Sequence, residues 1–216
     1  MITNLISSLT ANAKLGKGVA TSYRPVGTKN LGTCPSKCPL LPENGGACYT
    51  KKFLVNNQQR NSLKRNDEFD RFLLKGAKLI RLHTSGDFFR NNLLDIDYIR
   101  SITDWAKEHS DITIWTYSHD VQQLITNGFT YKDKCFSTNF HLVASCDSIK
   151  EKDLANSYGF RSARVIDLEE EKLEDETFCP YDLNLHRGRK PNTTCAKCTL
   201  CFNPKHRKNI AFLKQR

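Results

Sequence analysis

The central half of the chain alternates between short apolar runs and segments whose apolar residues recur at helical spacing. Alternation of strands with helices indicates crossover units that build a parallel sheet. We therefore expect an α/β fold with a parallel sheet, and no clear strand before Cys34. Strands are predicted at residues 78–83, 112–117, 134–137, 141–145 and 164–168, and helices at residues 53–75, 93–109, 121–127 and 148–158.

The length of 216 residues fits one domain, or one domain with a small appendage. No stretch approaches the roughly 20 continuous apolar residues that cross a bilayer, so we expect no membrane helix and no membrane partner. Residues 1–13 lack the positive and apolar regions of a secretory signal. The predicted location is therefore the cytoplasm, where the nine cysteines are better explained as metal ligands or catalytic thiols than as disulfides.

The net charge of +10 is divided unevenly along the chain. Residues 1–77 contain 12 Lys and Arg against 4 Asp and Glu, residues 78–185 contain 12 against 19, and residues 186–216 contain 9 against none. Clustered basic residues gain free energy by releasing counterions from a polyanion. The basic ends therefore favour a nucleic-acid or nucleotide partner, with solvated surface charge as the alternative.

Three cysteines, Cys34, Cys38 and Cys48, form an N-terminal cysteine group. Three thiolates leave one coordination position open for a substrate or cofactor, whereas four would close the site. That arrangement favours an iron–sulfur cluster with an open position. The alternative is a structural zinc site completed by a distant His or Cys.

A C-terminal cysteine group consists of Cys179, Cys195, Cys198 and Cys201. The C-x2-C-x2-C spacing of the last three brings their thiolates together by local chain geometry. Bacterial ferredoxins use such a run with a further Cys elsewhere, whereas a zinc ribbon usually has two separated C-x2-C pairs. The pattern therefore favours a 4Fe-4S cluster, with zinc as the alternative.

The predicted strand at residues 78–83 is followed by Thr-Ser-Gly-Asp. Ligands in parallel α/β folds bind at the carboxyl ends of the strands. Ser85, Gly86 and Asp87 offer backbone donors, a close approach and a carboxylate acceptor at that place. They are therefore candidate cofactor-binding residues, and the alternative is a tight turn in which Asp87 caps the next helix.

This layout, with three early cysteines and a Gly-acid pair after a strand, resembles that of radical S-adenosylmethionine enzymes. The resemblance implies a partial (β/α) barrel in which the N-terminal cysteine group holds a 4Fe-4S cluster and Ser85, Gly86 and Asp87 bind S-adenosylmethionine. Ser145 and Asp147 look like the Ser-x-Asp strand end of those barrels, and they are further candidate cofactor-binding residues. The chain also resembles phage proteins of unassigned function that carry a Cys-rich segment and an SGDFF segment.

Three more polar residues lie at predicted strand ends: His83, His119 and Asp120. They are candidate catalytic residues, because a His beside a carboxylate can transfer protons. For His83 the alternative is a hydrogen-bonded core residue. Cys135 and Cys146 lie in apolar surroundings and are expected to be buried thiols.

Two classes of function follow from these patterns. The first is a radical S-adenosylmethionine enzyme with one or two 4Fe-4S clusters, acting on a nucleic acid or nucleotide. The second is a non-catalytic phage or bacterial binding protein, stabilised by zinc or iron–sulfur, that contacts nucleic acid or a host protein. In both, residues 1–175 are predicted to form the β/α core with the three-Cys loop, and residues 176–216 a basic, Cys-rich extension that binds a metal or cluster.

Overall fold

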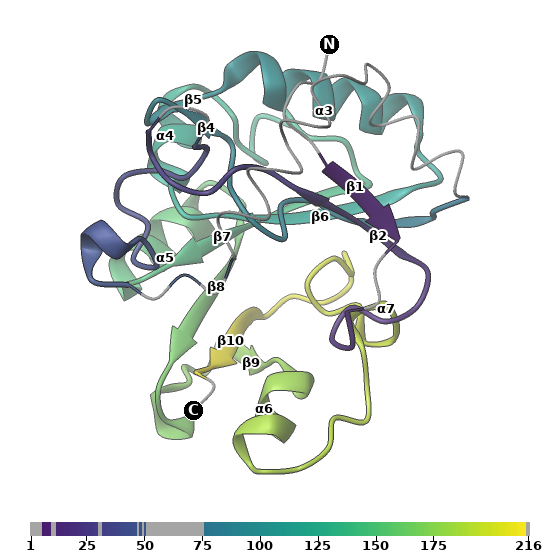
Figure 1. The fold of residues 1–216 in the computed structure, drawn as a ribbon, viewed down its shortest axis with the longest axis vertical. Coiled ribbons are helices and arrows are strands. Elements are labelled where there is room, and N and C mark those ends of the chain that lie inside the picture. The colour runs from purple at the N-terminus through teal and green to yellow at the C-terminus, as the bar shows by residue number, and fades with distance from the viewer. Residues whose placement is uncertain are drawn as a thin grey trace.

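A computed structural model shows one main sheet with helices on both of its faces (Figure 1). The helix predicted at residues 53–75 lies outside the described part of the chain. The structure describes residues 6–9, 12–29, 32–46, 48, 50 and 76–214.

The main sheet contains eight strands in the order β1-β2-β3-β6-β7-β8-β10-β9. β1 pairs antiparallel with β2, and every other pair of neighbours is parallel, which confirms the α/β class with a parallel sheet. The described strands form an open, twisted sheet with β1 and β9 at its edges, not a closed barrel (Figure 1). The strands are β1 (Ile6–Leu9), β2 (Val19–Tyr23), β3 (Leu79–Arg81), β6 (Thr113–Ser118), β7 (Phe140–Cys146), β8 (Arg161–Ile166), β9 (Glu176–Phe178) and β10 (Asn209–Leu213), and a separate hairpin joins β4 (Phe89–Arg90) to β5 (Leu93–Leu94).

One face of the sheet, the helix face, is covered by α3 (Ile96–Glu108), α4 (Val121–Thr126) and α5 (Ile149–Ser157) (Figure 1). Side chains alternate between the two faces along a strand, so every second residue of β6 and β7 points toward these helices. Ile114, Leu142 and Ala144 are buried there in the largest apolar cluster, together with Ile102 of α3 and Leu124 of α4. The main hydrophobic core therefore lies between the sheet and these three helices.

The opposite face of the sheet, the inner face, is covered by the C-terminal part of the chain. Figure 1 shows α6 (Pro180–His186) and α7 (Cys195–Cys198) on this side. Trp115 of β6 is buried here and packs on Phe202, with ring centroids 4.6 Å apart. Arg161 of β8 donates to the carbonyls of Leu200 and Asn203, at 2.6 and 3.0 Å. These contacts fix the C-terminal loop against the sheet.

Most of the predicted elements are present, with shifted ends. The helix predicted at residues 93–109 begins at Ile96, because Leu93 and Leu94 pair with β4 and Asp95 caps the helix by accepting from the Tyr98 amide. Asp95, and not Asp87, is therefore the N-cap residue of that helix, so the reading of Asp87 as a helix cap is wrong.

The strand predicted at residues 134–137 is wrong. Lys134 has a φ of 54°, and the Cys135 amide donates to the Thr130 carbonyl at 3.2 Å, so the chain turns there. A run of four residues is too short to show which strand it would pair with, and no strand of the described sheet accepts it.

Four strands of the main sheet were not predicted: β1, β2, β9 and β10. β1 and β2 precede Cys34, where no clear strand was expected, and β2 pairs with β3. β9 and β10 extend the same sheet beyond β8, so the chain after residue 175 contributes two strands to it. The division of the chain at residue 175 stays a prediction.

Asn139 fastens the end of α3 to the start of β6. Its side-chain amide donates to the carbonyls of Ala106, His109 and Ile112, at 2.9, 3.0 and 2.7 Å, and the residue is buried. We expect Asn139→Ala to lower the free energy of unfolding by about 2 kcal/mol, because buried carbonyls lose their donors. Urea denaturation measures this loss. The exposed Asn127, which also donates to a carbonyl, is the control, and Asn127→Ala should cost about 0.5 kcal/mol or less; equal losses would contradict the prediction.

Candidate functional site

The N-terminal cysteine group is brought together in the structure. Cys34 and Cys38 are buried, Cys48 is partly buried, and all three belong to one small apolar cluster with Val26 and Leu41. The backbone amide of Gly27 donates to the Cys34 sulfur at 3.4 Å. Hydrogen bonds to sulfur of this kind stabilise thiolate ligands.

The loop that carries this group is tied to the turn that follows β3. The Asp87 amide donates to the Thr33 hydroxyl at 3.1 Å, and the Phe89 amide donates to the Thr33 carbonyl at 3.2 Å. The Ser85 hydroxyl donates to the Arg24 carbonyl at 3.1 Å. The structure thus places Ser85, Gly86 and Asp87 directly beside the segment that leads into Cys34.

The atoms around residue 86 leave no room for a side chain, so this position requires glycine. Its φ is +75°, and an added Cβ would lie 2.5 Å from the Thr33 hydroxyl and 2.7 Å from the Arg24 carbonyl oxygen. The close approach that the sequence suggested for a ligand is here made by the chain itself.

Asp87 is buried and joins the ends of two strands. One carboxylate oxygen accepts from the Phe88 amide at 2.7 Å, and the other accepts from the His119 amide at 2.9 Å. Burial raises the pKa of this carboxyl to about 6, against the lowering effect of these amides and of Arg24. Both carboxylate oxygens thus already have backbone partners.

Arg24 lies behind this turn and connects it to two other segments. Its side chain has no exposed area. It donates to the Asp87 carbonyl and to the Asp95 carboxylate, both at 2.9 Å. Its guanidinium lies 3.8 Å from the centroid of the Tyr98 ring. One buried cation therefore joins the end of β2, the turn after β3 and the start of α3.

Lys37 lies between Cys34 and Cys38 in the sequence, and its side chain reaches residues that follow β6 and β7. Its ammonium lies 3.5 Å from Asp120 and 3.0 Å from Glu151, and these pairs raise its pKa although burial acts to lower it. Asp120 also accepts from the Gln123 amide as the N-cap of α4. Glu151 accepts from the Asp147 amide at 2.8 Å. The cysteine loop is thus anchored over the carboxyl ends of β6 and β7.

The other candidate residues lie in different surroundings. His83 is buried in the core, where its ring nitrogens face the hydroxyls of Tyr98 at 2.7 Å and Thr116 at 3.4 Å. His119 keeps about a quarter of its side chain exposed, with Nδ1 3.9 Å from the Asp87 carboxylate. Ser145 is half-buried in β7, and Asp147 is exposed just after that strand.

The C-terminal cysteine group lies on the inner face. Cys179 follows β9 and packs with Cys201 and Tyr117 against Val143, and Cys195 and Cys201 pack beside Trp115. The structure therefore separates the two groups. The N-terminal cysteine group lies over the carboxyl ends of the strands, and the C-terminal cysteine group lies on the inner face, against β6 and β7.

The cysteines are suited to metal binding by their chemistry. All nine are free of disulfides. Burial raises the pKa of the Cys34 thiol to about 12 and that of Cys195 to about 11, so both stay protonated at neutral pH unless a metal displaces the proton. Among the described residues, no three His, Cys, Asp or Glu side chains stand in a preformed metal-ion arrangement. The two donor sets fit an iron–sulfur cluster or zinc in ligand type, and the thiols must draw closer to bind one.

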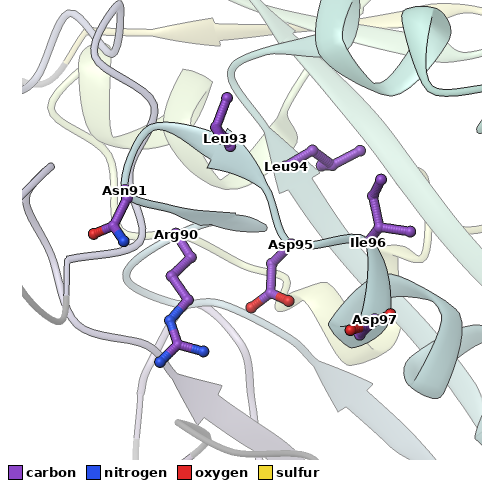
Figure 2. Close-up of a pocket in the computed structure, with 7 residues that line it drawn as sticks. All are labelled: Arg90, Asn91, Leu93, Leu94, Asp95, Ile96 and Asp97. Carbon is purple, nitrogen blue, oxygen red and sulfur yellow. The ribbon is translucent and has the colours of Figure 1, made fainter.

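A shallow pocket lies elsewhere, between the β4–β5 hairpin and the first turn of α3 (Figure 2). Arg90, Leu93 and Asp95 are among its lining residues, and Leu93 is 69% exposed. Asp95 is already paired with Arg24, so this pocket offers a ligand mainly the exposed side chains of the hairpin. No sequence motif indicated this pocket.

Fold and site together define an open parallel α/β protein with one cysteine group at the strand ends and another on the inner face. The family model for gene product 88 matches residues 4–210, so the chain belongs to the gene product 88 family. This phage family is consistent with the predicted resemblance to phage proteins, and no radical S-adenosylmethionine family model matches the chain. No curated protein and no solved structure matches the chain. None of the described helices has the length and apolarity needed to cross a membrane.

Several residues that organise the site were not predicted from the sequence: Arg24, Lys37, Lys14 and Tyr117. Lys37 had one available signal, its place between Cys34 and Cys38. The others depend on contacts between distant segments, such as the ion pair of Lys14 with Asp182.

One buried and two partly buried histidines predict a loss of stability in acid. Burial lowers the pKa of His119 and of His141 to about 4, and it lowers that of His83 well below the ordinary histidine value. As the pH falls, the histidines take up protons in the unfolded chain before they do so in the folded chain. The free energy of unfolding is therefore highest above the ordinary histidine pKa, and it falls as the pH drops toward 4. The raised pKa of Asp87 acts in the opposite direction. We expect a net loss of about 3 kcal/mol between about pH 7 and pH 5, measured by urea denaturation.

The variant His141→Gln is the control for the acid prediction. His141 is partly exposed, so solvent screening reduces its share to about 1 kcal/mol of the loss. The variant should be less sensitive to acid by that amount. A free energy of unfolding that stays level from pH 7 to pH 5 would contradict the prediction.

Proposed function

We propose that the chain is an iron–sulfur enzyme of the radical S-adenosylmethionine type. The observation that carries this proposal is the packing of Cys34, Cys38 and Cys48 into one cluster at the carboxyl ends of parallel strands, beside the turn that contains Asp87. Ligands and cofactors of parallel α/β folds bind at that edge of the sheet. Three cysteines, rather than four, leave a coordination position for a small molecule.

In this proposal the N-terminal cysteine group holds a 4Fe-4S cluster and the C-terminal group holds a second one. When bound there and reduced, a cluster with an open iron would supply the electron for the cleavage of S-adenosylmethionine. The backbone amides of Ser85 and Gly86, in the turn after β3, would orient the methionyl group together with Ser145 of β7 and Asp147 just after it. Lys37 would keep the loop in place through Asp120 and Glu151. His119, partly exposed beside Asp87, would be the group that exchanges protons with substrate.

The substrate class we propose is a nucleic acid or nucleotide. Arg187, Arg189, Lys190, Lys205 and Arg207 are exposed near the C-terminal cysteine group. Exposed lysines and arginines bind phosphates through counterion release. Arg187 already pairs with Glu169. A phage protein that acts on such substrates would work in the bacterial cytoplasm.

Anaerobic purification followed by iron, sulfide and absorption analysis tests the proposal. We expect a brown protein with about eight irons and eight sulfides per chain, falling to about four in Cys48→Ser and in Cys198→Ser. With dithionite and S-adenosylmethionine, the wild-type protein should release 5′-deoxyadenosine, and Cys48→Ser should not. Cys135→Ser is the matched control, because Cys135 belongs to neither group and should keep all irons. A colourless zinc protein would overturn the proposal.

The second candidate is a metal-stabilised binding protein without catalytic activity, contacting nucleic acid or a host protein. The observation that favours it is the use of both Asp87 oxygens by the amides of Phe88 and His119. A carboxylate with that role needs no cofactor to explain it. In this case the protein would contain about two zinc ions per chain, and calorimetry would detect no binding of S-adenosylmethionine.

A further inference from the structure

Three loops that are distant in the sequence meet at one edge of the main sheet. Residues 129–139 precede β7, residues 158–160 precede β8, and residues 199–208 precede β10. These three strands are parallel neighbours, so their amino ends share one edge of the sheet. The N-terminal cysteine group lies at the opposite edge, over the carboxyl ends of the strands. We call these three segments the amino-edge loops.

The first two amino-edge loops contact each other and present basic and aromatic side chains. The Lys132 amide donates to the Tyr158 carbonyl at 3.4 Å, and the Lys132 ammonium lies 5.8 Å from the centroid of the Tyr158 ring. Tyr158 is 36% exposed, and Lys132 and Lys134 are exposed as well. Asp133, between the two lysines, accepts from the Thr130 hydroxyl of its own loop. The loops therefore present two ammonium groups beside an accessible aromatic ring.

The third amino-edge loop is fastened to the start of β8 by Arg161. The Arg161 guanidinium donates to the carbonyls of Asn203 and His206. Within the loop, the Lys205 amide donates to the Asn203 side chain at 2.9 Å. A loop that is already ordered loses little conformational entropy when it binds a partner. Its exposed side chains are therefore held in place before any partner arrives.

This third loop is strongly basic. Residues 203–208 contain Lys205, Arg207 and Lys208, all exposed, and no Asp or Glu. The Lys208 ammonium donates to the Glu174 carbonyl at 3.2 Å, so the loop that precedes β9 borders the basic surface. Together, the amino-edge loops place five exposed basic side chains around Tyr158: Lys132, Lys134, Lys205, Arg207 and Lys208.

We propose that the amino-edge loops form a docking surface for a single-stranded nucleic acid. Lysines and arginines contact its phosphates, and one base stacks on Tyr158, since basic side chains beside an aromatic ring bind single strands in this way. The inference rests on the proposed function for the choice of a nucleic acid as the polyanion. It adds where the strand is held, at the edge of the sheet away from the N-terminal cysteine group.

Fluorescence anisotropy with a labelled oligothymidylate of about 20 nucleotides tests the inference on the full, anaerobically purified chain. We expect the affinity to fall as salt rises from about 50 to 200 mM, because bound phosphates release counterions. The triple variant Lys132→Ala, Lys205→Ala and Arg207→Ala should bind at least about 10-fold more weakly. The slope of log affinity against log salt should become shallower by about 2, because three phosphate contacts are lost.

A second triple variant is the matched control. Arg100→Ala, Lys150→Ala and Lys214→Ala remove the same charge from exposed positions outside the amino-edge loops, so affinity and salt slope should stay close to the wild-type values. Equal losses in the two triple variants would overturn the inference, because net charge alone would then explain binding.

The variant Tyr158→Ala tests the stacking contact separately from the charges. It should weaken binding about 5-fold or more and leave the salt slope unchanged, because a stacked base releases no counterion. Equal affinity for a duplex of the same length would overturn the assignment to a single strand.

The iron content of the same preparation distinguishes failure of this inference from failure of the proposed function. A protein with full iron content that does not bind the oligonucleotide would overturn the docking surface and leave an iron–sulfur enzyme with a nucleotide substrate. A zinc protein that binds the strand through the amino-edge loops would support the docking surface and overturn the radical-enzyme proposal.

Discussion

Asp95→Asn is expected to lower the free energy of unfolding by about 3–5 kcal/mol, because it leaves the Arg24 guanidinium buried without its counterion. Arg24 has no exposed side-chain area, and Asp95 is its carboxylate partner at 2.9 Å. Asparagine keeps the shape of Asp95 and a carbonyl acceptor for the Tyr98 amide, so the helix cap is largely preserved. The loss therefore reports on the charge alone, and urea denaturation measures it.

Asp97→Asn is the control for Asp95→Asn. Asp97 is exposed in the first turn of the same helix, so its loss removes only a favourable interaction with the helix dipole, about 0.5 kcal/mol. The double variant Arg24→Met with Asp95→Asn should recover part of the stability, because it removes the unpaired charge as well. If Asp95→Asn cost no more than Asp97→Asn, Arg24 would not depend on this pair.

Gly86→Ala is expected to cost about 3 kcal/mol or more. The residue has a φ of +75°, which an L side chain rarely adopts, and its Cβ would lie within 2.7 Å of Arg24 and Thr33. Part of the contact is with backbone, so the β2–Cys34 segment would have to move. Thermal or urea denaturation gives the loss, and iron retention after anaerobic reconstitution reports on the N-terminal cysteine group.

The variant Gly128→Ala separates the cost of the positive φ from the cost of the steric contact in Gly86→Ala. Gly128 has a nearly equal φ of +79°, and nothing lies within 4 Å of an added Cβ. Its replacement should therefore cost only the backbone term, about 1 kcal/mol. Equal losses in the two variants would show that the turn after β3 yields readily, and the proposed link to the cysteine loop would fail.

The sequence pattern was sufficient where an element is decided by its own residues. Apolar runs predicted β6 and β7 within two residues at either end, because strands buried on both faces need continuous apolar side chains. The helix after Asp120 was predicted to within one residue at its end, because its cap and its periodicity are local. Residues 134–137 failed for the opposite reason, since a short apolar run does not show whether a partner strand is available.

For the site, spacing alone separated the cysteines into two groups and placed Asp87 at a strand end. Local chain geometry determines both facts, because a few residues between cysteines keep their thiols close and a turn must follow a strand. Only the tertiary structure decided that the N-terminal cysteine group lies over the strand ends and the C-terminal cysteine group lies on the inner face. It also decided that Arg24 and Lys37 hold the first group's surroundings together through ion pairs and that Tyr117 packs against the second group. Those pairings join segments up to 114 residues apart, as Lys37 and Glu151 are, and they form only when the parallel sheet brings its strand ends to one edge.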